Sequence, residues 1–191
     1  MSLTFTAIAH DAHFREVQDW AVAPSSSTEP NQNMVELKER VRCMMYGRKP
    51  EPIFIRHTAT TKSRIDKKKR AQNDYCLKHF RTIRVNEAYR KKLKGRIVCV
   101  IDDYLTWGNT FETLRNLLVA CKVKEIIFVS IGKFKQNDEN VYIQKNFSID
   151  GDVHTANYTA IFDSDEEHTV TYDDDAQRSL RDLKELANHL Q

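Results

Sequence analysis

Two long apolar runs dominate the pattern of hydrophobic and polar positions, residues 97–101 (IVCVI) and residues 125–131 (EIIFVSI). Runs without alternation of apolar and polar residues are typical of strands that are covered on both faces, as in parallel sheets. Shorter apolar runs at residues 20–23, 53–55 and 158–162 predict further strands. The pattern therefore predicts a sheet with buried central strands.

Between these runs, apolar positions recur at the spacing of a helix with one buried face. Residues 33–45 and residues 110–121 show this spacing, and Asn33 is a suitable N-cap for the first helix. Residues 74–92 are weakly periodic and predict a helix over part of their length. Leucines on one face of residues 175–190, after acidic residues that favour a helix N-terminus, predict a closing helix.

Strand and helix patterns alternate, which predicts an α/β fold with a mainly parallel sheet flanked by helices and a C-terminal helical tail. The length of 191 residues suits a single domain. We expect its core at about residues 20–133 and a C-terminal strand and helix extension at residues 134–191, in which residues 137–152 form a loop or hairpin. Ligands of such sheets bind beyond the carboxyl ends of the strands. Three loops in that position follow Ala23, Ile55 and Ile101.

Composition narrows the class of protein. No apolar run approaches the roughly 20 residues that cross a bilayer, and the first residues do not have the pattern of a signal peptide. We therefore expect a cytoplasmic protein without a membrane partner. None of the four cysteines forms a C-x-x-C pair, so zinc-site spacing is absent and we expect reduced, mostly buried thiols.

Charge is unevenly distributed along the chain, although the net charge is only +3. Residues 62–96 contain fourteen Lys or Arg and three acids, whereas residues 163–175 contain seven acids and no Lys or Arg. Positive potential raises the local concentration of anions. The asymmetry indicates an anionic ligand near the basic stretch.

The strongest chemical pattern follows the first long apolar run. Asp102 and Asp103 stand at its carboxyl end, and a short loop leads from them into a helix that begins near Thr110. A helix N-terminus leaves about four backbone N–H groups without internal partners, and its dipole favours an anion. Gly108 permits close backbone approach, and the hydroxyls of Thr106 and Thr110 are suited to donate to phosphate oxygens.

The paired aspartates have more than one interpretation. Beside a phosphate they would repel it, unless they accept hydrogen bonds from adjacent sugar hydroxyls or hold a divalent metal. Two acids at a strand end are also a common turn or helix-cap device, and the loop would then be only a helix entry. The residues alone leave these alternatives open.

Residues 98–110 resemble the phosphoribosyl-diphosphate signature of type I phosphoribosyltransferases: four apolar residues, two acids, two more apolar residues and a small loop with hydroxyl residues and glycine. The resemblance implies the fold of that family, with Asp102 and Asp103 as catalytic residues that hold the ribose 2′- and 3′-hydroxyls. It implies Mg²⁺ as cofactor, held mostly through substrate and water rather than by the protein alone. The implied 5′-phosphate loop consists of Thr106, Trp107, Gly108, Asn109 and Thr110.

Two positions depart from that signature. Tyr104 stands where a smaller aliphatic residue is usual, and Trp107 stands where Ser or Thr is usual. The indole removes one hydroxyl donor to the phosphate, although the backbone N–H remains. The departure bears on turnover more than on ligand binding.

Upstream segments resemble the ComF-like branch of the family. Residues 20–28 are similar to its diphosphate loop, and residues 56–64 are similar to its flexible loop, which supplies cations to the leaving diphosphate. The implied residues are Ser25, Ser26 and Ser27 in the first loop and Lys62 and Arg64 in the second. Without the resemblance, these are a solvated turn and a solvated basic face. The cysteine-rich zinc module of many ComF-like proteins is absent, which weakens a role in DNA uptake.

The resemblance implies a protein that binds phosphoribosyl diphosphate, or a nucleotide monophosphate, and transfers the phosphoribosyl group to an unidentified nitrogen acceptor. A homodimer is implied by the family alone. Two alternatives stay open. One is a binding or regulatory protein of the same fold with little turnover, which Trp107 favours. The other is association with nucleic acid through residues 62–96, where phosphate contacts would dominate affinity.

Overall fold

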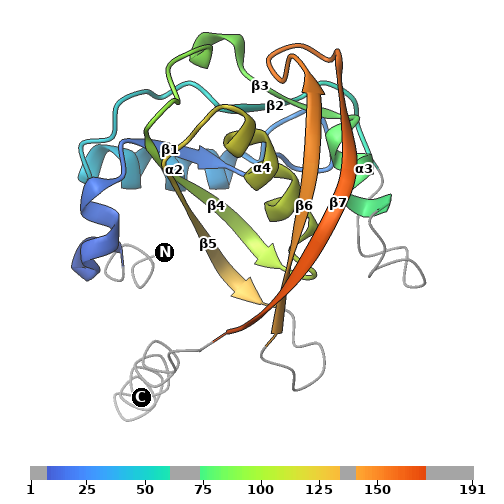
Figure 1. The fold of residues 1–191 in the computed structure, drawn as a ribbon. Coiled ribbons are helices and arrows are strands. Elements are labelled where there is room, and N and C mark those ends of the chain that lie inside the picture. Colours follow the sequence, from blue (N-terminus) through green and yellow to red (C-terminus); the bar gives the residue numbers. More distant parts are fainter. Residues whose placement is uncertain (1–7, 61–73, 134–140, 171–191) are drawn as a thin grey trace, which may run out of the picture.

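A computed structural model describes residues 8–60, 74–133 and 141–170 (Figure 1). The closing helix predicted over residues 175–190 lies outside the described residues, as do Lys62 and Arg64. The elements are η1 (Ala12–Glu16), β1 (Asp19–Val22), α2 (Gln32–Met44), β2 (Phe54–Arg56), α3 (Asp74–Phe80), β3 (Ile83–Val85), η2 (Glu87–Tyr89), β4 (Ile97–Leu105), α4 (Asn109–Ala120), β5 (Glu125–Lys133), β6 (Val141–Gly151) and β7 (Tyr158–Thr169).

The central sheet has three parallel strands in the order β1-β4-β5. Its register pairs Trp20 with Cys99, and Cys99 with Ile127. This confirms the α/β class with a parallel sheet. The expectation of full burial was wrong for β5, which is one of the two edge strands of the described sheet and whose side chains are half-buried or exposed.

Strand β4 is apolar at every position from Ile97 to Ile101 because each of its faces contributes to a different core. Val98 and Val100 pack in the core that contains the leucines of α4, whereas Cys99 and Ile101 pack in the core that contains α2. Successive residues of a strand point to opposite faces, so a strand between two helical layers needs apolar residues throughout. Figure 1 shows α4 and α2 on opposite sides of this sheet.

Two antiparallel pairs complete the described fold. β2 pairs with β3, so the strand predicted at residues 53–55 lies outside the parallel sheet. β6 and β7 form a long hairpin with a register shift between Asn146 and Phe147. Phe147 packs edge-on against Phe80 at a centroid distance of 4.9 Å. The segment predicted as a loop or hairpin at residues 137–152 is therefore mostly strand β6, while the strand predicted at residues 158–162 extends to Thr169.

The helix boundaries in the structure differ by a few residues from those predicted by the sequence. α2 begins at Gln32 with Asn31 as N-cap, two residues before the predicted Asn33, and the Asn31 carbonyl accepts the N–H of Val35 at 3.0 Å. In residues 74–92 only α3 is α-helical, and β3 and η2 follow it. Among the described residues, no helix is both long and apolar enough to cross a membrane.

Candidate functional site

The loop between β4 and α4 ends in a glycine with a left-handed backbone. Gly108 has φ 73° and ψ −1° and is the N-cap of α4, which begins at Asn109. A Cβ at this position would lie 2.7 Å from the ring of Tyr142 in β6. The positive φ of Gly108 and the close approach of the Tyr142 ring therefore each require glycine at this position.

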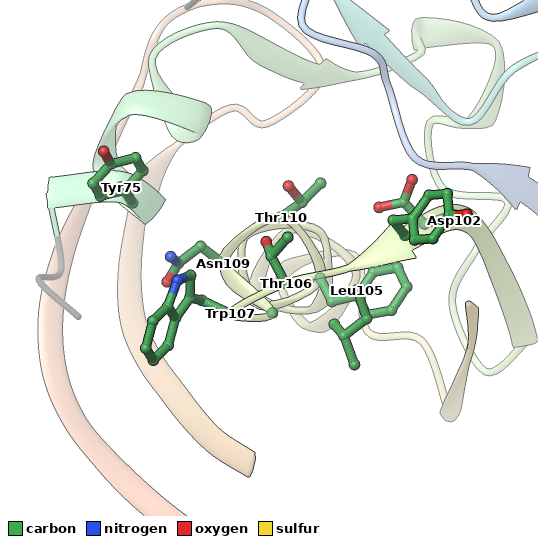
Figure 2. A pocket seen from close by; sticks show the side chains of 10 residues that line it. Tyr75, Asp102, Leu105, Thr106, Trp107, Asn109 and Thr110 are labelled. Carbon is green, nitrogen blue, oxygen red and sulfur yellow. The ribbon is translucent and has the colours of Figure 1, made fainter. Parts of the chain in front are cut away.

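Gly108, the N-cap of α4, makes no side-chain capping hydrogen bond. The carbonyl of Gly108 accepts the N–H of Glu112 at 2.8 Å, which closes the first turn. The N–H groups of a first turn have no carbonyl of their own helix to bind, and the helix dipole adds positive potential. The hydroxyls of Thr106 and Thr110 are close to the same helix end (Figure 2). This is the arrangement of main-chain and side-chain donors that binds an anion.

A recess of about 30 Å³ opens at this helix end, lined by residues 104–111, by Asp102 and, from α3, by Tyr75. Figure 2 shows Thr106 and Thr110 between Asp102 on one side and Trp107 on the other. A volume of this size has room for roughly two water-sized groups, which suits one compact polar group. The remainder of a larger ligand would extend outside the recess.

The two aspartates have different environments. Asp102 is half-buried and lines the recess, whereas Asp103 is exposed and does not line it. The difference arises because β4 continues as a strand to Leu105, so successive side chains point to opposite faces. The N–H of Asp103 donates to Oδ1 of Asp102 at 2.9 Å.

The ionisation of Asp102 is shifted by its surroundings. Burial raises the pKa of the Asp102 carboxyl to about 7, and the nearby Asp103 carboxylate raises it further, while the N–H of Asp103 lowers it. Asp102 therefore changes its charge near neutral pH. A carboxyl group in a recess with a perturbed pKa is a feature of many ligand sites.

Two aromatic side chains flank the recess. Trp107 is 41% exposed, and its indole extends beside Asn109, away from Asp102 (Figure 2). Tyr104 packs across Gly132 of β5, where a Cβ would lie 2.5 Å from the tyrosine ring. Both aromatic residues line the recess together with Thr106 and Thr110, which are half-buried.

Hairpin strand β6 is anchored on α4 beside this loop. The carboxylate of Glu112 is fully buried and accepts the hydroxyl of Tyr142 at 2.6 Å, the backbone N–H of Lys145 at 2.8 Å and Nε of Arg115 at 2.9 Å. These contacts place the Tyr142 ring against Gly108. Only the i, i+3 spacing of Glu112 and Arg115 is a signal in the sequence. Tyr75 and Tyr142 come from distant segments and were missed.

The serine loop after β1 lies at the same edge of the sheet, since the N–H of Ala23 donates to the carbonyl of Ile101 at 2.9 Å. The hydroxyls of Ser25 and Ser27 are used within the loop. Ser25 Oγ donates to the carbonyl of Glu29 at 2.8 Å, and Ser27 Oγ donates to the same carbonyl at 2.9 Å. The carbonyl of Ser26 accepts the N–H of Thr60 at 2.8 Å. None of the three serines lines the recess.

The residues at the recess are compatible with Mg²⁺ only as a metal held largely by a ligand and water. Among the described residues, no group of three or more His, Cys, Asp or Glu side chains is arranged to hold a metal ion. Asp102 supplies one carboxylate, and Asp103 points to the other face of β4. Magnesium commonly binds through one or two carboxylates together with substrate phosphates.

Comparison of this chain with models of protein families, with curated proteins and with solved structures finds no match in any of the three. The fold and the recess define a candidate anion site, formed by a strand, a loop and a helix N-terminus at the carboxyl edge of a parallel sheet.

Proposed function

We propose that this protein is a phosphoribosyltransferase with a type I phosphoribosyltransferase-like fold. It binds phosphoribosyl diphosphate with Mg²⁺ at the loop between β4 and α4. The observation that carries the proposal is the α4 N-terminus, whose N-cap Gly108 is left-handed and makes no side-chain capping hydrogen bond, with the ionisable carboxyl of Asp102 in the same recess. Donors for a phosphate and an acceptor for sugar hydroxyls are thereby next to each other.

In the proposed reaction, the bond between C1 of the ribose and a diphosphate oxygen breaks, and the electron pair leaves on the diphosphate. A bond forms between C1 and the acceptor nitrogen, and the proton of that nitrogen is released to solvent. The 5′-phosphate binds to Thr106, to Thr110 and to the N–H groups in the first turn of α4. The ionised carboxylate of Asp102 accepts a hydrogen bond from a ribose hydroxyl. Mg²⁺, held mostly by the ligand and water beside the carboxylate of Asp102, would supply positive charge that stabilises the leaving diphosphate. The role of Asp103 in sugar binding stays a prediction.

Calorimetric titration with phosphoribosyl diphosphate and Mg²⁺ at pH 8 tests the proposal. We expect saturable binding, and we expect Asp102→Asn to weaken it at least tenfold, because an amide cannot supply the charge of the carboxylate. Asp103→Asn tests the predicted role of Asp103 separately, since that side chain does not line the recess. A change of less than threefold in affinity would restrict sugar binding to Asp102. Absence of saturable binding by the wild-type protein, or undiminished affinity of Asp102→Asn, would refute the assignment.

A second candidate is a protein that binds the same ligand without turnover. Trp107 favours it, because the family signature has Ser or Thr at this position and the indole does not supply that hydroxyl donor. Release of diphosphate from phosphoribosyl diphosphate across a panel of nucleobases and amines separates the two candidates. Release with any acceptor supports the enzyme, whereas tight binding without release supports the binding protein.

A further inference from the structure

A larger cavity of about 260 Å³ lies between the loop after β1, helix α2 and strand β2. All four prolines of the chain line it, together with other apolar side chains such as Val35 and Phe54. Its volume is just below the range of about 300–1,000 Å³ that is usual for small-molecule sites. The cavity does not share a lining residue with the recess at Asp102.

Arg56, the last residue of β2, lines this cavity and is only 5% exposed. Its Nε donates to the carbonyl of Ser25, its Nη1 donates to Oγ1 of Thr82 at 2.6 Å, and its Nη2 donates to Nδ1 of His79 at 3.2 Å. His79 is neutral in this position, because burial and the neighbouring guanidinium lower its pKa to about 3. Every partner of Arg56 among the described residues is therefore uncharged.

A buried cation with only neutral partners is costly, so such groups are normally paired with an anion. Burial lowers the pKa of Arg56 to about 10, which still leaves the side chain charged at neutral pH. A guanidinium has five N–H donors, and the described contacts use one on each nitrogen. One N–H on each terminal nitrogen remains, which matches the two oxygens of a carboxylate.

We propose that this cavity binds a small monocarboxylic acid, with its apolar body against the prolines and its carboxylate paired with Arg56. The charges on the cavity favour one negative charge over two. Lys38 also lines it, but its ammonium already pairs with Glu39 and donates to the carbonyl of Pro50 at 2.7 Å. Glu29 adds a carboxylate to the lining. A phosphate dianion would thus meet a single uncompensated cation and an acid.

The cavity is also joined to the serine loop. Pro24, Ser25 and Ser27 form part of its wall, and the carbonyl of Ser25 accepts from Arg56. An acid bound to Arg56 therefore contacts the loop that lies beside the end of β4. The proposal does not depend on phosphoribosyl transfer, because it concerns residues outside the recess.

Benzoate is a suitable probe, and benzamide is an uncharged analogue that serves as the control. In two-dimensional NMR of the full chain, we expect benzoate to shift the Nε–H resonance of Arg56 saturably at millimolar concentrations and benzamide to shift it at least tenfold more weakly. Arg56→Gln should weaken benzoate binding at least tenfold, and Val35→Trp should abolish it by filling the cavity while leaving Arg56 in place. Binding of phosphoribosyl diphosphate by Val35→Trp should be retained.

Three results would overturn the assignment. Equal binding of benzoate and benzamide would show an apolar cavity without anion recognition. Undiminished benzoate binding in Val35→Trp would place the acid elsewhere. Inorganic phosphate that binds more tightly than benzoate, and displaces it from Arg56, would show that the class of anion is wrong. The wild-type and Val35→Trp measurements decide the question even if Arg56→Gln does not fold.

Discussion

The loops that follow β1 and β4 lie at the same edge of the sheet, yet they use their polar groups in opposite ways. In the loop after β1, the hydroxyls of Ser25 and Ser27 both donate to the carbonyl of Glu29. After β4, Thr106 of the connecting loop and Thr110 of the first turn of α4 line a recess at the helix N-terminus. The first loop has more hydroxyl groups, but the second is the better candidate for a phosphate.

The difference teaches that backbone geometry matters more than hydroxyl content for an anion site. Only three residues connect β4 to α4, and left-handed Gly108 turns the chain so that the first turn of α4 opens on the recess. In the longer loop after β1, serine hydroxyls donate to a carbonyl of the same loop. This loop forms part of the wall of an apolar cavity. The positive charge of that cavity comes from another element, through Arg56 of β2.

The largest effect that we expect in this comparison follows Gly108→Ala. The new Cβ would meet the Tyr142 ring at 2.7 Å in addition to occupying a left-handed backbone. Strain and overpacking together should lower the free energy of unfolding by about 2–4 kcal/mol and weaken binding of phosphoribosyl diphosphate. Urea denaturation and calorimetry measure the two effects.

Gly95→Ala is the matched control for this change. Gly95 has φ 72°, almost the same as Gly108, but a Cβ there would have no neighbour within 4 Å. We expect a loss of only about 1 kcal/mol from strain, and unchanged ligand affinity. Equal losses at the two glycines would mean that the contact with Tyr142 does not shape the loop.

A smaller effect should appear as pH dependence at the recess. Asp102, whose pKa is about 7 in the folded protein, is mostly protonated below that pH and cannot then act as a charged acceptor. Affinity for phosphoribosyl diphosphate should therefore fall as pH decreases from 8 to 6, approaching about tenfold per unit below pH 7. The ligand's own phosphates also titrate, so the difference between wild type and Asp102→Asn is the quantity to measure. Parallel profiles for the two proteins would rule out Asp102 as the titrating group.

The same pKa shift has a consequence for stability, with the opposite trend. A carboxyl whose folded pKa lies above its unfolded value of about 3.8 takes up a proton on folding between those two values. Its contribution to stability is complete below about pH 4 and is lost as pH rises through about 7. Asp102→Asn should therefore stabilise the ligand-free protein at pH 8 by on the order of 2 kcal/mol and have little effect at pH 4. A stability difference that does not vary with pH would contradict the raised pKa.

Much of the sheet could be predicted because its causes are local. The run at residues 97–101 is apolar throughout since each side of β4 faces a core, and this is visible in the sequence. The run in β5 looks alike, but its burial depends on what other parts of the fold cover it, which its own residues do not encode. Likewise, β2 is apolar and short, and its sequence does not show that its partner is β3 rather than the parallel sheet.

The recess could be predicted only in part, for a similar reason. Gly108 and the threonines lie in one continuous loop, so their spacing identified them. The separation of Asp102 from Asp103 depends on β4 remaining extended to Leu105, which two adjacent acids do not reveal. The ring of Tyr142 reaches Gly108 because buried Glu112 holds β6 on α4, about 30 residues away in sequence.

The smallest expected effects compare the hydroxyls of the two loops directly. Ser25→Ala or Ser27→Ala should each lower the free energy of unfolding by about 0.5–1.5 kcal/mol, because each removes a hydrogen bond to the carbonyl of Glu29 and leaves that acceptor less satisfied. Affinity for phosphoribosyl diphosphate should stay within twofold, since a diphosphate bound at that loop would use its backbone N–H groups. Thr106→Ala and Thr110→Ala should have the reverse outcome, with unfolding free energies changed by less than about 0.5 kcal/mol and affinity reduced about three- to tenfold. If instead the serine variants lost affinity and the threonine variants lost stability, the loop after β1 would be the anion site and the recess at α4 a structural turn.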